Sequence, residues 1–335
     1  AKVMWVSTFH SACVRILRKE ASLLGYTNSF TIYDQSDSLR LITLVMKDLN
    51  LDAKKYAPRA VAALISQAKN ELLGPADYLN QSKDHFQEIV AQVFAIYQKR
   101  LSGANSMDFD DLIAKTVEVM QRHPEVRAKY RSRFKHILVD EYQDTNHAQY
   151  VLIKELVGND RDGIAPAELC VVGDADQSIY AFRGANIRNI LQFEADYPNA
   201  KTILLEQNYR STQNILSAAN AVIANNDGRK EKNLWSEAGD GAMITGYVAE
   251  SEHDEADFVV REIGRLRDLG KSNPGDTAIF YRTNAQSRVF EEVFMRIGIP
   301  YKVVGGVRFY ERKEIKDFLA YLRVVVNPED EVSLR

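Results

Sequence analysis

The segment Ile137-Leu-Val-Asp-Glu-Tyr-Gln-Asp-Thr-Asn146 gives the clearest indication of the fold class. Three apolar β-forming residues run directly into two adjacent carboxylates, Asp140 and Glu141. A short apolar run of this kind is typical of a buried strand that is covered on both faces. Open α/β sheets bind their ligands at the carboxyl ends of the strands, so the position of these two carboxylates predicts a ligand-binding site. Two carboxylates there can hold Mg²⁺ and position an attacking water; the plainer alternative is a solvated acidic turn.

Composition limits the class of protein. The 335 residues are 45% hydrophobic and 27% charged, as in an ordinary soluble protein of two or three domains. No apolar run is long enough to span a membrane, and no segment resembles a signal peptide. With only Cys13 and Cys170, a disulfide scaffold is excluded and a cytoplasmic location is expected.

Charge is unevenly distributed along the chain. The net charge of −3 gives no overall nucleic-acid footprint. Residues 135–200, however, hold 5 basic and 11 acidic side chains, a local charge of −6. An acidic environment of this kind suits a divalent cation.

The spacing of apolar residues predicts the order of elements. The chain is expected to begin with a strand at Val3–Ser7 and a helix over 11–24. From Asp34 to Met120 the apolar residues recur at helical spacing and no segment is convincing as a strand. This part of the chain is therefore predicted to be an all-helical insertion. After Phe134 strands and helices alternate, as in a parallel, doubly wound sheet. The expected strands are 136–140, 169–173, 202–206, 243–248, 277–281 and 301–304; the expected helices are 147–157, 186–197, 213–225, 252–269, 286–297 and 313–325.

Two further strand ends carry polar side chains. Gln177 follows the strand at 169–173 and can hydrogen-bond both a phosphate oxygen and a water. Tyr180, Phe182 and Arg183 supply planar groups for stacking on bases, unless the two aromatic rings belong to the core. These residues predict a nucleotide site beside a single-strand binding loop.

Tyr209 and Arg210 follow the strand at 202–206, before a helix that Ser211 or Thr212 can cap. The guanidinium can reach developing negative charge, and the ring can stack on a base. A surface Arg210 paired with Glu206 fits the spacing equally well. Elsewhere, Gly264 to Ser272 resembles a P-loop but has five residues between its glycines instead of four, so no Walker A motif is present.

Taken together, the motifs resemble those of the UvrD/PcrA/Rep family of superfamily-one DNA helicases, in particular its actinobacterial UvrD/PcrA members. The resemblance covers nearly the whole chain, in the family's order and spacing. The segments that carry it are Thr8-Phe-His-Ser11, Val139–Asn146, Val172-Gly-Asp-Ala-Asp-Gln-Ser-Ile-Tyr180, Phe182-Arg-Gly-Ala185, Gln207-Asn-Tyr-Arg-Ser-Thr212, Tyr301–Gly306 and Phe309–Asp317.

The resemblance implies two partial RecA-like motor domains of the P-loop NTPase fold with an all-helical inserted subdomain. The implied boundaries are 1–30 with 111–201 for the first motor domain, 31–110 for the insertion, 202–327 for the second, and 328–335 for the start of a second accessory domain. It also implies an ATP-driven motor that moves 3′ to 5′ on single-stranded DNA and unwinds duplex at single-strand/double-strand junctions. Repair or replication proteins are possible partners, and a membrane is not.

Residue roles follow from the same resemblance. Asp140 would hold Mg²⁺, Glu141 would activate the hydrolytic water, and Gln177 would couple the γ-phosphate of ATP to the DNA. Arg210 would contact the γ-phosphate across the cleft, and Tyr209 would stack on adenine. The residues that would contact DNA are Phe9, His10, Tyr180, Phe182, Arg183, Gly305, Gly306, Arg308 and Phe309.

The family's P-loop would precede Ala1, and its later motifs, including a further arginine finger, would follow Arg335. The chain is therefore expected to be an internal piece that neither hydrolyses ATP nor unwinds DNA alone. Three alternatives stay open: the helicase part of a helicase–nuclease subunit, a non-catalytic single-strand binding module, and a metal-dependent nuclease or phosphatase. The last would use Asp140, Glu141, Asp144, Asp174 and Asp176.

Overall fold

The computed structural model describes residues 4–159, 163–181, 184–227, 232–304 and 313–334. The chain divides into two compact units, each described by itself. Unit 1 comprises Ala1–Leu204, Asn226–Glu231 and Asp317–Arg335, and unit 2 comprises Leu205–Asn225 and Lys232–Lys316. The domain boundaries drawn from the sequence stay predictions. No helix in the described part of the chain is both long and apolar enough to cross a membrane.

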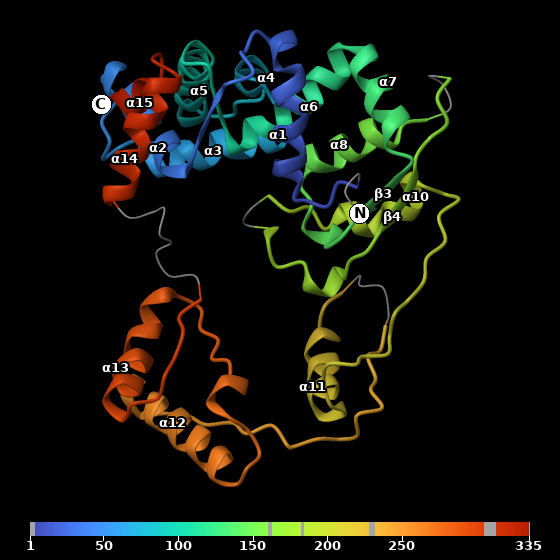
Figure 1. Ribbon diagram of the computed structural model, residues 1–335, viewed down its shortest axis with the longest axis vertical. Coiled ribbons are helices and arrows are strands. Elements are labelled where there is room, and N and C mark those ends of the chain that lie inside the picture. The colour runs from blue at the N-terminus through green and yellow to red at the C-terminus, as the bar shows by residue number, and fades with distance from the viewer. Residues whose placement is uncertain (1–3, 160–162, 182–183, 228–231, 305–312, 335) are drawn as a thin grey trace. The chain divides into compact units, whose positions relative to one another are not determined.

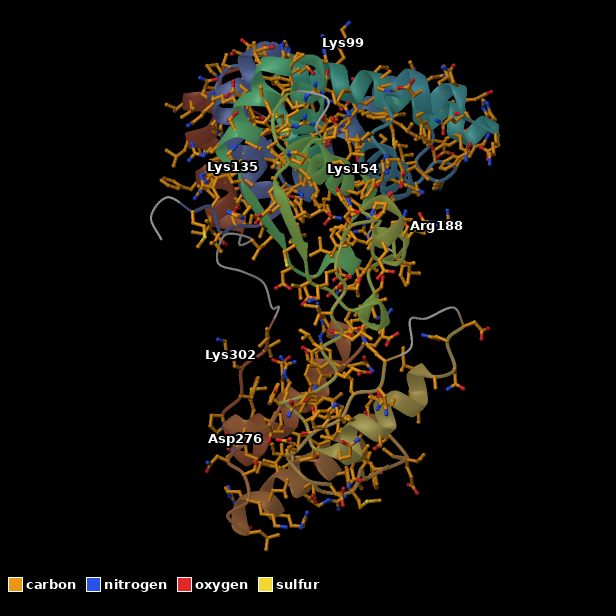
Figure 2. All side chains as sticks on the ribbon, turned by 90° about the vertical axis from the view of Figure 1, so that its right-hand side faces the viewer. Lys99, Lys135, Lys154, Arg188, Asp276 and Lys302 are labelled. Atoms are coloured by element: carbon orange, nitrogen blue, oxygen red, sulfur yellow. The ribbon has the colours of Figure 1, made fainter. Side chains whose placement is uncertain are left out.

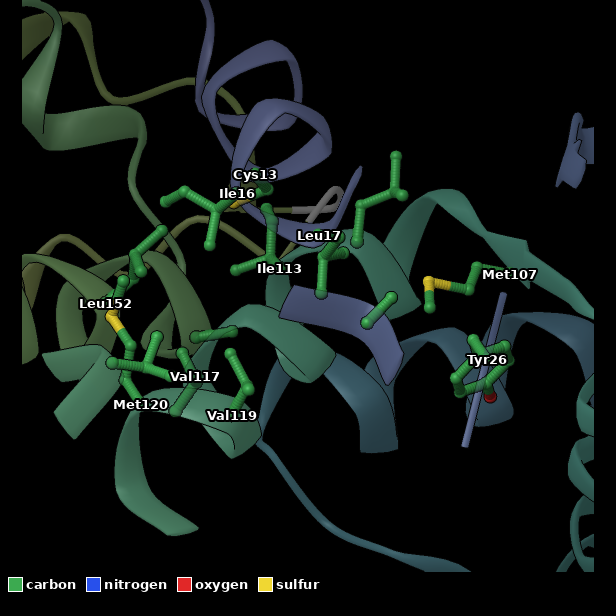
Figure 3. Close-up of a cluster of buried hydrophobic side chains, with 14 of the residues drawn as sticks. Cys13, Ile16, Leu17, Tyr26, Met107, Ile113, Val117, Val119, Met120 and Leu152 are labelled. Carbon is green, nitrogen blue, oxygen red and sulfur yellow. The ribbon is translucent and has the colours of Figure 1, made fainter. Parts of the chain in front are cut away.

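In unit 1, α1 (Phe9–Glu20) packs against α6 (Phe109–Arg122), and α6 packs against α7 (Pro124–Arg133) and α8 (His147–Val157). The side chain of Thr8 caps α1 by accepting a hydrogen bond from the N–H of Ser11. A 3₁₀ turn, η1 (Ala21–Leu24), completes the helix predicted for 11–24. Figure 3 shows the shared core, to which Ile16, Leu17, Ile113 and Val117 contribute. Each such buried side chain stabilises the fold by roughly 1.5–3 kcal/mol.

The insertion is built from α2 (Gln35–Asp48), α3 (Pro58–Asn70), α4 (Pro75–Asn80) and α5 (His85–Gly103). Val45, Val61 and Phe94 lie at the centre of its separate core. The prediction that the insertion contains no strand is wrong, because β1 (Thr31–Tyr33) and β2 (Ser106–Asp108) form a short parallel pair. Three-residue strands whose pairing partner lies far along the chain leave no periodic signal in the sequence.

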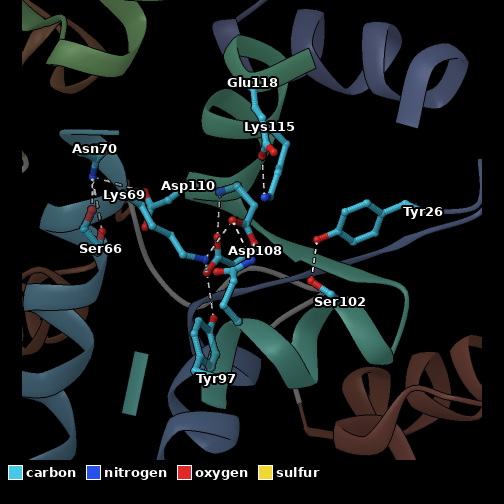
Figure 4. A network of polar contacts seen from close by, with 12 residues as sticks. Tyr26, Ser66, Lys69, Asn70, Tyr97, Ser102, Asp108, Asp110, Lys115 and Glu118 are labelled. Atoms are coloured by element: carbon cyan, nitrogen blue, oxygen red, sulfur yellow. Dashed lines mark hydrogen bonds and ion pairs between the residues drawn. The ribbon is translucent and has the colours of Figure 1, made fainter. Parts of the chain in front are cut away.

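An ionic network joins α3 to the start of α6 (Figure 4). Lys69 Nζ lies 2.6 Å from Asp108 Oδ2 and 3.0 Å from Asp111 Oδ1. The hydroxyl of Tyr97 donates to the same oxygen of Asp108 at 2.8 Å. Burial alone would lower the pKa of Lys69, but the two carboxylates outweigh burial and raise it. Other charged side chains of unit 1, such as Lys99, Lys135 and Arg188, are exposed (Figure 2).

The end of the chain returns to this insertion. After α14 (Lys313–Val326), the amide of Asn327 donates to the carbonyl oxygen of Ala104 at 2.7 Å. The hydroxyl of Tyr33 donates to Asp330 Oδ1 at 2.6 Å, and α15 (Glu331–Leu334) contacts α2 (Figure 1).

The central strands of unit 1 are β3 (His136–Val139) and β4 (Glu168–Val171), which pair in parallel with Ile137 opposite Leu169. This confirms the two strand predictions that indicated the fold class. The prediction that β3 is covered on both faces is wrong, because Leu138 is 77% exposed. The helix predicted over 186–197 is two short helices, α9 (Arg188–Leu191) and α10 (Phe193–Asp196), and the described residues 4–7 form no strand.

Unit 2 contains α11 (Gln213–Ile223), α12 (Glu252–Asp268) and α13 (Ser287–Ile297). Figure 1 shows α12 and α13 side by side; Val260, Ile263 and Phe294 pack between them. The predicted strands at 202–206, 243–248, 277–281 and 301–304 are wrong for the described chain. Their apolar side chains are largely exposed, and among the described residues their backbone pairing is limited to an isolated bridge between Gln207 and Trp235.

Candidate nucleotide site

The site begins where β3 ends. The N–H of Val172 donates to the carbonyl oxygen of Val139 at 2.8 Å, and the N–H of Tyr142 donates to that of Val172 at 3.0 Å. These bonds continue the ladder past the last paired residues. Asp140 and Glu141 therefore stand exposed at the carboxyl end of a parallel strand pair, where the sequence predicts a ligand.

Glu141 has a left-handed backbone, with φ of 52° and ψ of 44°. This conformation costs a non-glycine residue roughly 1–2 kcal/mol, and strained residues of this kind gather at functional sites. The N–H of Glu141 donates to Asp140 Oδ1 at 3.0 Å, and its carbonyl oxygen accepts from Asp144 at 2.9 Å. The chain reverses sharply and leaves both carboxylates on the outside.

Gln143 is a residue that the sequence reasoning assigned no chemistry. It is 1% exposed, and its amide Nε2 donates to Glu141 Oε2 at 2.8 Å. Its Oε1 accepts the backbone N–H of Asp174 at 2.9 Å. Gln143 thus links the two loops that follow β3 and β4, and its position within the acidic motif is the only signal that could have identified it.

The loop after β4 carries the predicted phosphate sensor. Asp174 caps the 3₁₀ turn η4 (Ala175–Gln177), and its Oδ2 accepts from Gln177 Nε2 at 2.8 Å. Gln177 is exposed and Tyr180 is half-buried. Phe182 and Arg183 lie outside the described residues.

The acidic residues can be tested for a metal site. Mg²⁺ is usually held by one or two carboxylates together with phosphate oxygens and water, and the exposed Asp140 beside Glu141 fits this donor set. Within the described ranges, no three His, Cys, Asp or Glu side chains form a metal-binding group. Asp144 stands apart: its Oδ1 is buried and has no hydrogen-bond partner among the described residues, and burial, followed by the charge of Glu141, raises the pKa of Asp144.

Two predicted DNA-binding residues lie at the start of α1. Phe9 is half-buried and packs against both the α1–α6 core and the core around Val139. The ring of His10 meets Phe109 edge to face at 5.8 Å, and burial lowers the pKa of His10. Phe9 therefore has a packing role, whatever else it contacts.

Tyr209 and Arg210 belong to unit 2 and are exposed. The hydroxyl of Tyr209 donates to Gln207 Oε1 at 2.7 Å. Asn208 Oδ1 accepts the N–H groups of Arg210 and Ser211, which turns the chain into α11. Thr212 occupies the N-cap position, as the sequence suggests, but its side chain makes no capping hydrogen bond. The remaining predicted DNA contacts, Gly305, Gly306, Arg308 and Phe309, lie outside the described residues.

Comparison with known proteins extends these observations over the whole chain. Residues 1–198 match the UvrD/REP helicase N-terminal domain, and residues 203–335 match the UvrD-like helicase C-terminal domain. These matches confirm the RecA-like fold class.

Individual relatives agree with the family matches. The chain is 62% identical over 340 residues to the ATP-dependent DNA helicase UvrD1 of Mycobacterium tuberculosis, covering 100% of this chain and 44% of that protein. It is 52% identical to the ATP-dependent DNA helicase PcrA of Bacillus subtilis, covering 98% of this chain and 44% of that protein. The chain thus spans less than half the length of these relatives. With both halves of its length matched and its acidic strand end in place, the chain belongs to the UvrD/REP helicase family.

Proposed function

We propose that this chain supplies the carboxylate part of the ATPase site in an ATP-dependent DNA helicase. The observation that carries the proposal is the exposed pair Asp140 and Glu141 at the end of β3, connected through Gln143 to the loop of Gln177. The relatives that match over the whole chain are named ATP-dependent DNA helicases.

Each residue has a distinct task in this proposal. Asp140 would hold Mg²⁺, and the ion would supply positive charge to the phosphate groups of ATP. Glu141 orients and deprotonates the attacking water, and its turn keeps the carboxylate at the surface, where a nucleotide can approach. Gln177 contacts the γ-phosphate, while Arg210 and Tyr209 of unit 2 contact the γ-phosphate and the adenine ring.

The DNA substrate is part of the same proposal. Single-stranded DNA is held by stacking on Phe9, Tyr180 and Phe182, with Arg183 and His10 alongside, and by Gly305, Gly306, Arg308 and Phe309 of the second half. Movement is 3′ to 5′, toward single-strand/double-strand junctions, with repair or replication proteins as partners.

The test is a Glu141→Gln substitution in a full-length protein that contains this chain. DNA-stimulated ATP hydrolysis should fall about 10²- to 10⁴-fold, the usual contribution of a general base, while ATP binding persists. Glu71→Gln, an exposed residue of the insertion, is the matched control and should retain wild-type turnover. Wild-type turnover in the Glu141→Gln enzyme would refute the proposed role.

The isolated 335-residue chain provides a second test. It has no Walker A sequence to cradle the phosphates, so it should show no DNA-stimulated ATPase activity. Phosphate release by the purified chain that rises on addition of single-stranded DNA would contradict this expectation.

A further inference from the structure

The amide of Gln143 has a defined orientation. Its Oε1 lies 2.9 Å from the backbone N–H of Asp174, which can only donate, so the oxygen has to face that group. The Nε2 group is thereby directed at Glu141 Oε2, 2.8 Å away. The hydrogen bond to the carboxylate is charge-assisted, and such bonds are about twice as strong as neutral ones.

Gly173 makes room for this arrangement. A Cβ atom at Gly173 would lie 2.6 Å from Gln143 Oε1 and 3.1 Å from the backbone nitrogen of Tyr142. The backbone of Gly173 is not left-handed, so the lack of a side chain, not an unusual φ, is what the position requires. The close approach of β4's end to Gln143 is thus built into the sequence.

The hydrogen bonds form a line across the site. Gln143 connects Glu141 to Asp174, and Asp174 in turn accepts from Gln177. At one end stands a carboxylate on a strained turn exposed to solvent, and at the other an exposed amide. Gln143 and Asp174 connect Glu141 to Gln177, and the side chain of Gln143 is 1% exposed and held in place by packing.

We propose that Gln143 is a positioning residue for ATP hydrolysis: its amide fixes the carboxylate of Glu141 and ties it to the loop that carries Gln177. This inference rests on the proposed function. Gln143 does not touch the nucleotide; it acts through Glu141. Misplacement of a reacting group by about 1 Å can cost about 100-fold in rate, so a fixed carboxylate matters for turnover more than for ATP binding.

The experiment uses a full-length protein that contains this chain, with Gln143→Ala as the first variant. The kcat of DNA-stimulated ATP hydrolysis should fall about 10- to 100-fold, while KM for ATP and equilibrium nucleotide binding change less than about twofold. Gln121→Ala is the matched control, because Gln121 also donates to a carboxylate, that of Glu155, on distant helices. Its kcat should equal that of the wild type.

Gln143→Glu separates positioning from simple loop linkage. At a pH at which it is ionised, the glutamate keeps the size of the side chain and the acceptor for Asp174, but it has no proton to donate to Glu141. Its kcat should be as low as that of Gln143→Ala. Recovery of wild-type kcat in Gln143→Glu would overturn the proposal, because linkage of the loops would then suffice.

Gly173→Ala disturbs the amide of Gln143 without changing Gln143 itself. The new methyl group displaces Gln143 Oε1, so kcat should fall about tenfold with KM for ATP unchanged. In single-turnover measurements, adding Gln143→Ala to Glu141→Gln should reduce the rate no further, because the carboxylate that Gln143 positions is already gone.

The outcomes separate the two proposals. A further loss of about tenfold or more in the Glu141→Gln, Gln143→Ala double variant would show that Gln143 does not act through Glu141 and would overturn the inference alone. Full activity of Gln143→Ala beside an inactive Glu141→Gln would do the same. Full activity of Glu141→Gln itself would overturn the proposed function.

Discussion

Lys69 is 4% exposed, and its ammonium group is held by Asp108 and Asp111 in the interior of unit 1. Burying three charges is tolerable only because each has a partner and Tyr97 supplies a further hydrogen bond. The network connects α3 to the start of α6. Its stability therefore depends on every member being present.

Lys69→Ala should destabilise the protein by about 3–5 kcal/mol, because two buried carboxylates then lose their counter-charge. The measurement is the midpoint of urea unfolding, compared with Lys47→Ala on the exposed face of α2, which should change it little. If Lys69→Ala were as stable as the control, the buried ion pairs of Lys69 with Asp108 and Asp111 would not contribute to stability.

Asp110 gives a prediction about pH. Burial, followed by the charge of Asp108, raises the pKa of Asp110 to about 6. Between the unfolded value near 3.8 and about 6 the folded state binds more protons, so stability falls as pH rises through this window.

Asp110→Asn should therefore be more stable than the wild type by about 2 kcal/mol at pH 7.5 and should lose this advantage near pH 4. Urea unfolding at the two pH values measures the difference. Glu71→Gln, an exposed carboxylate of the insertion, should show no such dependence. An equal advantage at both pH values would mean that titration of Asp110 is not its source.

At the level of elements, two helices of the insertion, α2 and α5, start at aspartate caps, Asp34 and Asp84. Asp34 accepts the N–H of Asp37 at 2.8 Å, and Asp37 Oδ2 accepts the N–H of Asp34 at 3.1 Å, which is a complete capping box at α2. These bonds satisfy backbone donors that the helix itself leaves unpaired.

Asp34→Ala should lower stability by about 1 kcal/mol, the usual cost of a lost N-cap. Asp34→Ser keeps an oxygen at the same position and should be closer to the wild type. Thermal melting of both variants checks the order. Equal melting temperatures for alanine and serine would show that the cap contributes little here.

At the level of the whole molecule, the chain leaves unit 1 for unit 2 and then returns. Its last described residues bind the insertion through Asn327 and Asp330, which are 6% and 0% exposed. The bond between Tyr33 and Asp330 joins residues 297 positions apart. The two ends of the sequence thus stabilise one another within unit 1.

Tyr33→Phe removes the donor to Asp330 and leaves a buried carboxylate oxygen with one partner fewer. Amide hydrogen exchange of residues 327–334 should become faster by about 5- to 30-fold, equivalent to about 1–2 kcal/mol. Tyr321→Phe, at a residue of α14 that is 76% exposed, should leave this exchange unchanged. Unaltered protection in Tyr33→Phe would show that this contact does not hold the segment.

The strand end at Asp140, the second strand before Gln177 and most of the helices could be predicted from the amino-acid sequence. These are local patterns: an apolar run that stops at a charge, or apolar residues three and four apart, reports the element without knowledge of its neighbours. The motif spacing also predicted the family, which the matches over residues 1–198 and 203–335 confirm.

Which of the predicted elements pair with a neighbour became clear from the folded structure. The apolar runs near Leu205 and Phe280 look like strands, yet a strand exists only where another chain segment accepts its hydrogen bonds. The role of Gln143 depends on Asp174, 31 residues away, and the space beside it depends on Gly173. A residue's type sets the bonds it can make, but packing between distant segments selects the bonds it does make.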